Sequence, residues 1–301
     1  MEIKTKELIE KPLLFKALTG VSVEEFKDLI VVFQESYIAL VYELNPTRKR
    51  SFGGGQRGVL PTWEDKLLFV LFYLRHYPGF AVLGYMFGKD TGRSHKAIKF
   101  YLMVVSKSLG RRLVLPKKKI TSVEELLAKI PEIKDLFIDG TERAVNKPKN
   151  LKKRNKLYSG KKKTTTRKNV VVSTEKKYIV LMSETKSGRR HDKRILDKTG
   201  WLEYVPEDIT LWTDTGFQGL QKQHSNTVMP SKARKNNRLT PEQKQNNRII
   251  SSIRVVSEHA IGGYKRFKAA SEKFRNRIPN LDDLINRICA GLWNLHLEHT
   301  T

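Results

Sequence analysis

Two short apolar runs, each followed by an aspartate and a glycine, constrain the fold of this chain more than any other feature. Residues 136–138 run into Asp139 and Gly140, and residues 209–213 run into Asp214, with Gly216 two positions further on. Apolar runs of this length beside glycine are typical of buried strands. We therefore predict a sheet that carries carboxylates at the ends of two strands.

Further segments predict the rest of this sheet and the helices around it. Residues 169–174 and 178–184 are strand candidates that form a hairpin, and residues 227–229 are a fifth strand candidate. Helices are predicted over residues 192–198 and 242–267.

The long helix predicted over residues 242–267 supplies a third carboxylate. At about 100° per residue, Arg254, Glu258 and Lys265 fall within about 40° of one another, so they share one stripe of the helix. The apolar residues centre on a second stripe roughly 140° away; they are Ile249, Ile253, Val256, Ala260, Tyr264 and Phe267. The helix is thus predicted to have a core-facing side and a site-facing side, although Gly262 and Gly263 weaken it locally.

Asp139, Asp214 and Glu258 form a candidate metal site. Cleavage of a phosphodiester by two metal ions needs hard oxygen ligands that hold two magnesium ions about 4 Å apart. Two aspartates at strand ends and one glutamate on a helix can supply such ligands. The alternative is that these are ordinary surface carboxylates, because the chain has 31 acidic residues and only local context separates these three from the rest.

The charge of the chain indicates a polyanionic partner. Lys and Arg number 58 against 31 Asp and Glu, which gives a net charge of +27 and favours nucleic acid. The longest apolar run, residues 67–74, is too short to span a bilayer, and residues 1–12 lack the apolar core of a signal peptide. We therefore expect a cytoplasmic protein with no membrane partner. The single cysteine, Cys289, essentially excludes disulfides and cysteine-based metal sites.

The first third of the chain is predicted to be helical. Ser22 and Glu25 have capping-box spacing ahead of a helix of about six turns. Helices over residues 64–77 and 80–87, a turn at 88–90 and a helix over 91–109 describe a helix-turn-helix. Its third helix would face the major groove with Arg93, Ser94, His95 and Lys96. The alternative is a small helical bundle with solvated charges, and the overall charge favours DNA.

A basic run lies between Lys147 and Lys168, with 11 Lys or Arg in 22 residues and no acidic residue. Such a density repels itself unless phosphates or counterions intervene. We interpret it as a DNA-binding segment whose phosphate contacts are Lys161, Lys162 and Lys163; the alternative is a solvated loop. We interpret His191 and Asp192 as a polar surface pair, because the seven histidines lack the spacing of metal ligands.

These segments together resemble the signature blocks of DDE transposases. The blocks are Asp139-Gly140-Thr141, Tyr158-Ser159-Gly160-Lys161-Lys162-Lys163, Asp214-Thr215-Gly216-Phe217-Gln218-Gly219 and Arg254-x3-Glu258-x6-Lys265. The chain is most similar to bacterial insertion-sequence enzymes related to the PIF/Harbinger group, and the similarity covers roughly residues 48–295. It departs from the family pattern at Ser251, where that pattern has Tyr.

The resemblance implies an α+β protein, in which an N-terminal all-α helix-turn-helix region precedes a ribonuclease H-like α/β catalytic domain with a mixed sheet. We expect a helical segment at residues 1–47, the helix-turn-helix domain at 48–119 and the catalytic domain at 120–301. Asp139, Asp214 and Glu258 would bind two Mg²⁺ ions, or Mn²⁺ in their place. Arg254 and Lys265 would contact DNA phosphates near the reacting bond.

The resemblance also implies an activity. The chain would cut double-stranded DNA at the terminal inverted repeats of an insertion sequence and join the 3′-hydroxyl ends to target DNA. It would work in the bacterial cytoplasm, at the nucleoid, as a homodimer or larger assembly, because two element ends must be joined. Two alternatives stay open: a non-catalytic DNA-binding protein derived from a transposase, and a ribonuclease H-like nuclease without strand transfer.

Overall fold

The computed structural model describes residues 3–49, 58–127, 133–233 and 238–300. The chain forms two compact units. Unit 1 comprises Met1–Leu115, Tyr264–Glu272 and Ile278–Thr301, and unit 2 comprises Pro116–Gly263 and Lys273–Arg277. The three-part division of the chain stays a prediction.

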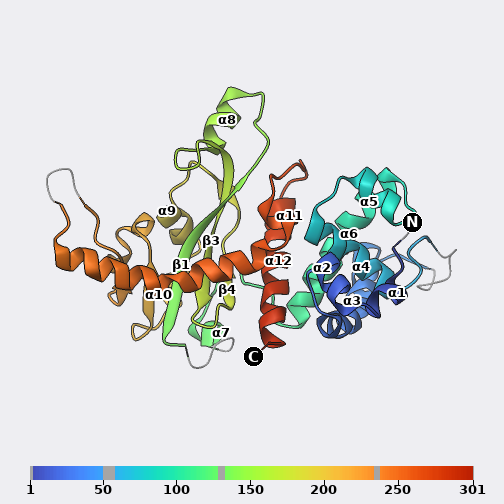
Figure 1. The fold of residues 1–301 in the computed structure, drawn as a ribbon, viewed down its shortest axis with the longest axis horizontal. Coiled ribbons are helices and arrows are strands. Elements are labelled where there is room, and N and C mark those ends of the chain that lie inside the picture. Colours follow the sequence, from blue (N-terminus) through green and yellow to red (C-terminus); the bar gives the residue numbers. More distant parts are fainter. Residues whose placement is uncertain (1–2, 50–57, 128–132, 234–237, 301) are drawn as a thin grey trace. The chain divides into compact units, whose positions relative to one another are not determined.

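Unit 1 is built from helices (Figure 1). They are α1 (Thr5–Ile9), α2 (Pro12–Thr19), α3 (Val23–Leu44), α4 (Trp63–His76), α5 (Phe80–Met86), α6 (Thr91–Arg111), α11 (Lys268–Ser271) and α12 (Leu281–Glu298). The capping box of Ser22 and Glu25 opens α3 as predicted, and Thr62 and Asp65 form a second one at α4. Every residue of α4 from Leu67 to Leu74 is buried, so this helix is the centre of the unit.

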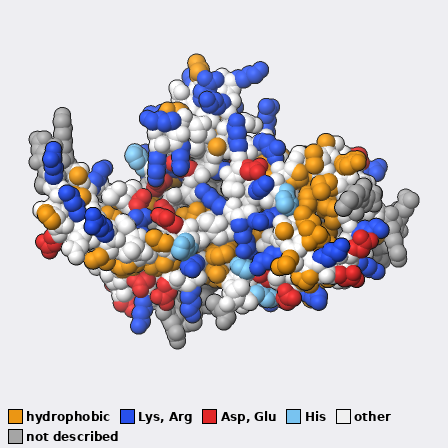
Figure 2. Space-filling view, in the orientation of Figure 1, with side chains coloured by type: hydrophobic (Ala, Val, Ile, Leu, Met, Phe, Trp, Pro, Cys, Tyr) orange, Lys and Arg blue, Asp and Glu red, His pale blue; other side chains and the backbone are white. Residues whose placement is uncertain are grey.

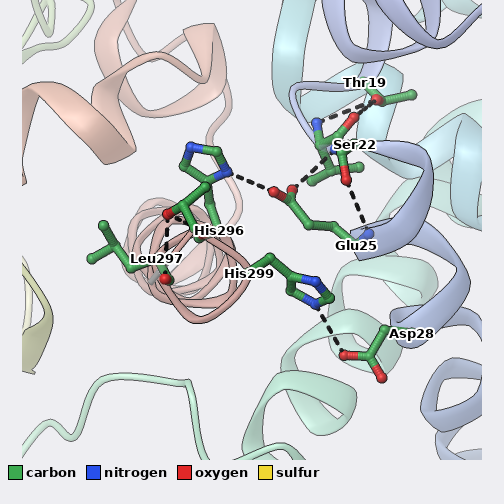
Figure 3. Close-up of polar contacts among 9 residues, drawn as sticks. Thr19, Ser22, Glu25, Asp28, His296, Leu297 and His299 are labelled. Atoms are coloured by element: carbon green, nitrogen blue, oxygen red, sulfur yellow. Dashed lines mark hydrogen bonds and ion pairs between the residues drawn. The ribbon is translucent and has the colours of Figure 1, made fainter.

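The C-terminal helix α12, which contains Cys289, is fixed to α3 by polar contacts (Figure 3). Nδ1 of His296 lies 2.6 Å from Oε1 of Glu25, which is itself the capping-box residue of α3. Nε2 of His299 lies 3.3 Å from Oδ2 of Asp28 one turn further along α3. The last helix of the chain therefore completes the unit that begins at its N-terminus.

Unit 2 is an α+β unit around one sheet of seven strands. The strands are β1 (Asp135–Ala144), β2 (Tyr158–Ser159), β3 (Thr164–Thr174), β4 (Ile179–Met182), β5 (Lys186–Ser187), β6 (Thr210–Thr213) and β7 (Thr227–Val228). The helices are α7 (Val123–Leu127), α8 (Leu151–Leu157), α9 (Asp192–Asp197) and α10 (Pro241–Lys265), with 3₁₀ turns at Trp201–Tyr204, Thr215–Phe217 and Leu220–Lys222. The last two residues of α10 belong to unit 1.

The sheet is mixed, as expected, and its strand order is β2-β3-β1-β6-β7, with β4 and β5 also paired to β3. β1 is antiparallel to β3 and parallel to β6, and β6 is parallel to β7. The hairpin of β3 and β4, the helix α9 and the long helix α10 all lie where the sequence predicts them. The prediction of an α+β protein with a helical N-terminal region and a mixed sheet is therefore confirmed.

Two strands are longer than predicted: β3 begins at Thr164 instead of Asn169, and β1 continues past Asp139. Asp139 does not end β1 but lies in its middle, because the antiparallel partner β3 continues the pairing from Asp139↔Val171 to Ala144↔Thr166. Glycine and charged residues after Asp139 were interpreted as the end of the strand, although a strand paired along one edge tolerates both.

The core of unit 2 lies on one face of the sheet. Leu136 and Ile138 of β1 pack there with Leu211 of β6, and Ile195 of α9 and Trp201 cover them. All five side chains are buried. Because strand side chains alternate between faces, this packing directs Phe137 and Asp139 to the opposite face.

No helix among the described residues is long and apolar enough to cross a membrane.

Candidate active site

The register of β1 and β6 brings Asp139 and Asp214 together. The parallel pairing ends with Ile138 opposite Thr213, and the next residue of each strand is an aspartate. Each carboxylate accepts a hydrogen bond from a nearby glycine N–H: Oδ1 of Asp139 from Gly140 at 2.7 Å, and Oδ1 of Asp214 from Gly216 at 2.8 Å. The two aspartates therefore occupy equivalent positions at one edge of the paired strands.

Figure 1 shows α10 passing across β1 in the view. The charge of Arg254, in the middle of α10, acts on the Asp139 carboxylate. Nε of Arg254 is buried and has no hydrogen-bond partner among the residues that the structure describes. A buried donor without a partner is costly unless a ligand satisfies it, so Arg254 can accept an anion beside Asp139.

The electrostatics of the pair favour a bound cation. Burial raises the pKa of Asp139 to about 6, and the neighbouring Asp214 carboxylate raises it in the same direction. The Gly140 N–H, Arg254 and Lys161 lower this pKa but do not cancel the rise. A buried carboxylate whose ionisation is opposed by a neighbouring carboxylate is stabilised by a cation beside it.

A third carboxylate, Asp192, lies at the first residue of α9, near Asp214. Burial raises the pKa of Asp192, and the charges of Asp214 and Glu142 raise it further while Lys168 lowers it. Its Oδ1 lies 3.3 Å from Nζ of Lys168, which also lies 3.2 Å from Oε1 of Glu142. The interpretation of Asp192 as a polar surface residue is therefore wrong.

Glycines make room for Asp192 in the site. A Cβ atom at Gly140 would lie 2.8 Å from Cγ of Asp192, and one at Gly216 would lie 2.9 Å from Oδ1 of Asp214. Both glycines thus permit close approach of the carboxylates. The spacing of His191 and Asp192 gave no signal for this, but the two glycines that follow the predicted aspartates could have indicated a crowded site.

The predicted third ligand, Glu258, is not fixed by strand pairing. It lies one helical turn after Arg254 on α10, on an exposed part of the helix. Among the described residues, no group of three or more His, Cys, Asp or Glu is close enough to hold a metal ion. Lys265 is the last residue of α10. The structure thus brings Asp139, Asp214 and Arg254 together, and the roles of Glu258 and Lys265 stay predictions.

The first part of α10 also differs from the predicted apolar stripe. Ala260, Tyr264 and Phe267 are buried as predicted, but Ile249 is 52% exposed. The helix therefore has a covered second half and a largely uncovered first half.

The basic run between Lys147 and Lys168 forms a projection of unit 2. It contains α8 and β2 and continues into β3, and Figure 2 shows Lys and Arg side chains gathered over it at the top of the view. Lys161, Lys162 and Lys163 are exposed in the turn between β2 and β3. Of these three, Lys161 acts electrostatically on Asp139.

In unit 1, α5 and α6 form the predicted turn around Gly88, which has a φ of 62°. Arg93 and Lys96 are exposed on the first turns of α6, and His95 packs against the Phe80 ring at 4.9 Å. Ser94 is fully buried, and its Oγ would lie 3.0 Å from a Cβ at Gly84. The prediction that Ser94 faces a DNA groove is therefore wrong, because this small residue lets α5 and α6 approach closely.

Comparison with known protein families identifies the family of this chain. A family model described as "DDE superfamily endonuclease" matches residues 138–294, just over half of the 301 residues. The chain belongs to the DDE superfamily of endonucleases. A second model, the helix-turn-helix of DDE superfamily endonucleases, matches residues 59–109, which contain α4, α5 and α6. The helix-turn-helix and the endonuclease domain of this DDE protein imply that it binds DNA.

A similar protein supports the assignment to this family. The DDE protein is 30% identical over 297 residues to the "Probable transposase for insertion sequence element IS702" of Microchaete diplosiphon, which covers 98% of this chain and 97% of the relative. No solved structure matches. The resemblance to DDE transposases of bacterial insertion sequences is thus confirmed, and the relation to the PIF/Harbinger group stays a prediction.

DDE superfamily membership implies dependence on divalent metal ions. Asp139 and Asp214 fit such an ion, because they are hard oxygen donors side by side and their mutual repulsion leaves a negative site.

Proposed function

We propose that this protein cuts DNA at the terminal inverted repeats of an insertion sequence and joins the freed 3′-hydroxyl ends to target DNA. The observation that carries the proposal is the β1–β6 register, which sets Asp139 and Asp214 side by side directly after Ile138 and Thr213. Paired carboxylates beside a basic surface suit a phosphodiester substrate.

The residues of the site would divide the work as follows. Asp139 and Asp214 would hold divalent metal ions, two Mg²⁺ or in their place Mn²⁺, and Glu258 would complete the ligand set. When bound, these ions activate the attacking oxygen and stabilise the leaving oxygen of the phosphodiester. Arg254 would bind the phosphate through its buried, unpartnered Nε.

Other cations would position the DNA. Lys161, Lys162 and Lys163 are exposed in the turn between β2 and β3, and Lys265 ends the helix that carries Glu258. In unit 1, Arg93, His95 and Lys96 of α6 would contact the DNA. Because two element ends must be joined, we expect the working form to be a homodimer or larger assembly in the bacterial cytoplasm.

A nicking and strand-transfer assay with the DNA that flanks this gene tests the proposal. Asp139→Asn and Asp214→Asn should each lower Mg²⁺-dependent cleavage by about a thousandfold or more, since each removes a ligand worth several kcal/mol in the transition state. Asp208→Asn is the matched control, because Asp208 is exposed in the turn before β6.

The products distinguish the alternatives. Joined DNA molecules support a transposase, whereas cleavage without joining indicates a nuclease. Binding without cleavage, or cleavage that survives both substitutions, would overturn the proposed chemistry.

A further inference from the structure

A basic cavity lies next to the candidate active site in unit 2. It has a volume of about 550 Å³, within the range of small-molecule sites. The side chains that line it include Asn155, Tyr158, Lys161, Lys168, Arg189 and Arg190, and none of the described lining residues is acidic. A hollow with four cations and no acid selects an anion.

The cavity and the carboxylates share residues. Lys168 lines the cavity and lies 3.3 Å from Oδ1 of Asp192, and Lys161 lines it and acts on Asp139. Because Lys168 is already engaged by Asp192 and by Glu142, the other lining cations are the ones left for a ligand. They are Lys161, Arg189 and Arg190.

Tyr158 gives the cavity an aromatic surface. This tyrosine belongs to the short strand β2, and 45% of its surface is exposed although its backbone is paired with Thr165. Asn155, one turn earlier on α8, adds an amide that can both donate and accept hydrogen bonds. Cations that track phosphates, together with an aromatic ring on which a base can stack, are the combination that binds single-stranded nucleic acid.

Gly188 contributes to the lining of the cavity at a crowded position. Gly188 is buried, and a Cβ atom there would lie 2.0 Å from Oγ1 of Thr166 and 2.8 Å from the Leu157 carbonyl oxygen. A second hollow of about 380 Å³ shares Arg189, Arg190 and His191 with the first. It adds Lys156 and Arg194, so the basic surface continues beyond the space needed for one nucleotide.

We propose that this cavity binds an unpaired nucleotide of the DNA, with its base stacked on Tyr158 and its phosphate held by Lys161, Arg189 and Arg190. The inference rests on the proposed function, since the nucleotide would belong to the strand that enters the site of Asp139 and Asp214. A base pair inside a duplex cannot stack on this ring, because both of its faces are covered by neighbouring base pairs. The cavity would therefore stabilise DNA that is opened next to the reacting bond.

DNA binding by the full-length protein tests the inference. The probes are a blunt duplex of 20 base pairs and the same duplex with three unpaired thymidines at one 5′ end or one 3′ end. Dissociation constants are measured by fluorescence anisotropy with Ca²⁺ in place of Mg²⁺. We expect Tyr158→Ala to weaken binding of one overhang DNA by about 5- to 100-fold, as expected for loss of one stacked base, and binding of the blunt duplex by less than about twofold.

Two variants control the measurement. Tyr158→Phe keeps the ring and should bind overhang DNA like the wild type. Tyr42→Ala removes a tyrosine that is 43% exposed on α3 of unit 1 and should leave the overhang preference unchanged. Equal losses for blunt and overhang DNA with Tyr158→Ala, or no loss for either overhang, would overturn the inference.

The outcome is separable from that of the proposed function. Asp139→Asn should abolish cleavage and keep the overhang preference. If the wild type cleaves and joins DNA but shows no preference that depends on Tyr158, the cavity inference alone fails. If the preference is present and no DNA is cleaved, the proposed chemistry alone fails.

Discussion

The two aspartates and the glutamate of the candidate site are held in different ways. Asp139 and Asp214 follow directly on the paired residues Ile138 and Thr213, so the hydrogen bonds of the sheet fix both. Glu258 is exposed on α10, a helix whose first half is largely uncovered, with Ile249 52% exposed. The sheet therefore determines the positions of the two aspartates proposed as metal ligands, whereas the proposed third ligand depends on how one helix is positioned.

This difference has a physical basis. A strand register is set by many hydrogen bonds and by alternation of the side chains, and a slip of one residue moves every side chain to the other face. A surface helix is positioned only by the apolar side chains that it buries. In α10 these are Ala260 and Tyr264, both after Glu258. Binding of metal and DNA is the event expected to bring Glu258 to the aspartates.

Replacement of Glu258 is the strongest test of whether α10 contributes a third carboxylate to the aspartates of the sheet. We expect Glu258→Gln to lower Mg²⁺-dependent cleavage by about a hundredfold or more, because a third metal ligand would be lost. Glu242→Gln, an exposed position in the first turn of the same helix, is the matched control and should cleave like the wild type. Cleavage rates under single-turnover conditions give the comparison. If Glu258→Gln equals its control, the site consists of the sheet carboxylates without Glu258.

Arg254 tests whether α10 influences the aspartates of the sheet, because Arg254 lies on α10 and its charge acts on Asp139. Its charge lowers the pKa of Asp139, so Arg254→Met should raise that pKa above about 6. The acidic limb of the pH–rate profile at sub-saturating Mg²⁺ should then move to higher pH, since ionised Asp139 is the metal ligand. At pH 8, where Asp139 is ionised in both proteins, a loss of about tenfold should remain from the phosphate contact.

The control for this profile is Arg248→Met, an exposed arginine earlier on α10. Arg248→Met should not change the pH at which the acidic limb of the pH–rate profile falls. Arg254→Lys keeps the charge and should restore the limb but not the full rate at pH 8. An unchanged acidic limb in Arg254→Met would show that α10 does not influence the aspartates in solution.

The smallest expected effect is on stability. Burial and Asp214 raise the pKa of Asp139 from 3.8 to about 6, so the folded protein binds this proton more tightly than the unfolded chain. Ionisation of Asp139 therefore lowers the free energy of unfolding progressively between about pH 4 and 6 and fully above pH 6, by on the order of 3 kcal/mol. Without metal, Asp139→Asn should raise the melting temperature at pH 7.5 by a few degrees, and should raise it little below pH 4.

Calorimetry in EDTA at the two pH values measures this difference, with Asp208→Asn as the control. Mg²⁺ should stabilise the wild type at pH 7.5 and have little effect on Asp139→Asn. A lower melting temperature of Asp139→Asn at pH 7.5 would contradict the electrostatic account of the pair.

Much of the fold follows from local signals in the sequence. The spacing of Ser22 and Glu25 correctly predicts the start of α3, and the apolar run before Asp214 correctly predicts β6. These signals suffice because caps and buried strands depend on neighbours in the chain. The length of β1 does not follow in this way, since it is set by its pairing with β3, and neither does the burial of Ser94 beneath Gly84.

The surroundings of the site were harder to predict than its two aspartates. Asp192 lies beside Asp214 because α9 packs on the sheet, and the charge of Lys168 that engages it comes from β3. Such contacts join segments far apart in the sequence, and a His-Asp pair in a loop gives no sign of them. The same holds for the cavity, whose residues come from the α8–β2 region and from the segment before α9.

The short register of β1 and β6 also determines where the length of this chain can change. An extra residue within 135–139 or 210–214 would turn one aspartate toward the apolar side of the sheet. An extra residue in the connection between α9 and β6 would leave both aspartates in place. Proteins of this family that differ in length are therefore expected to differ in such connections and to keep the two strand segments at constant length.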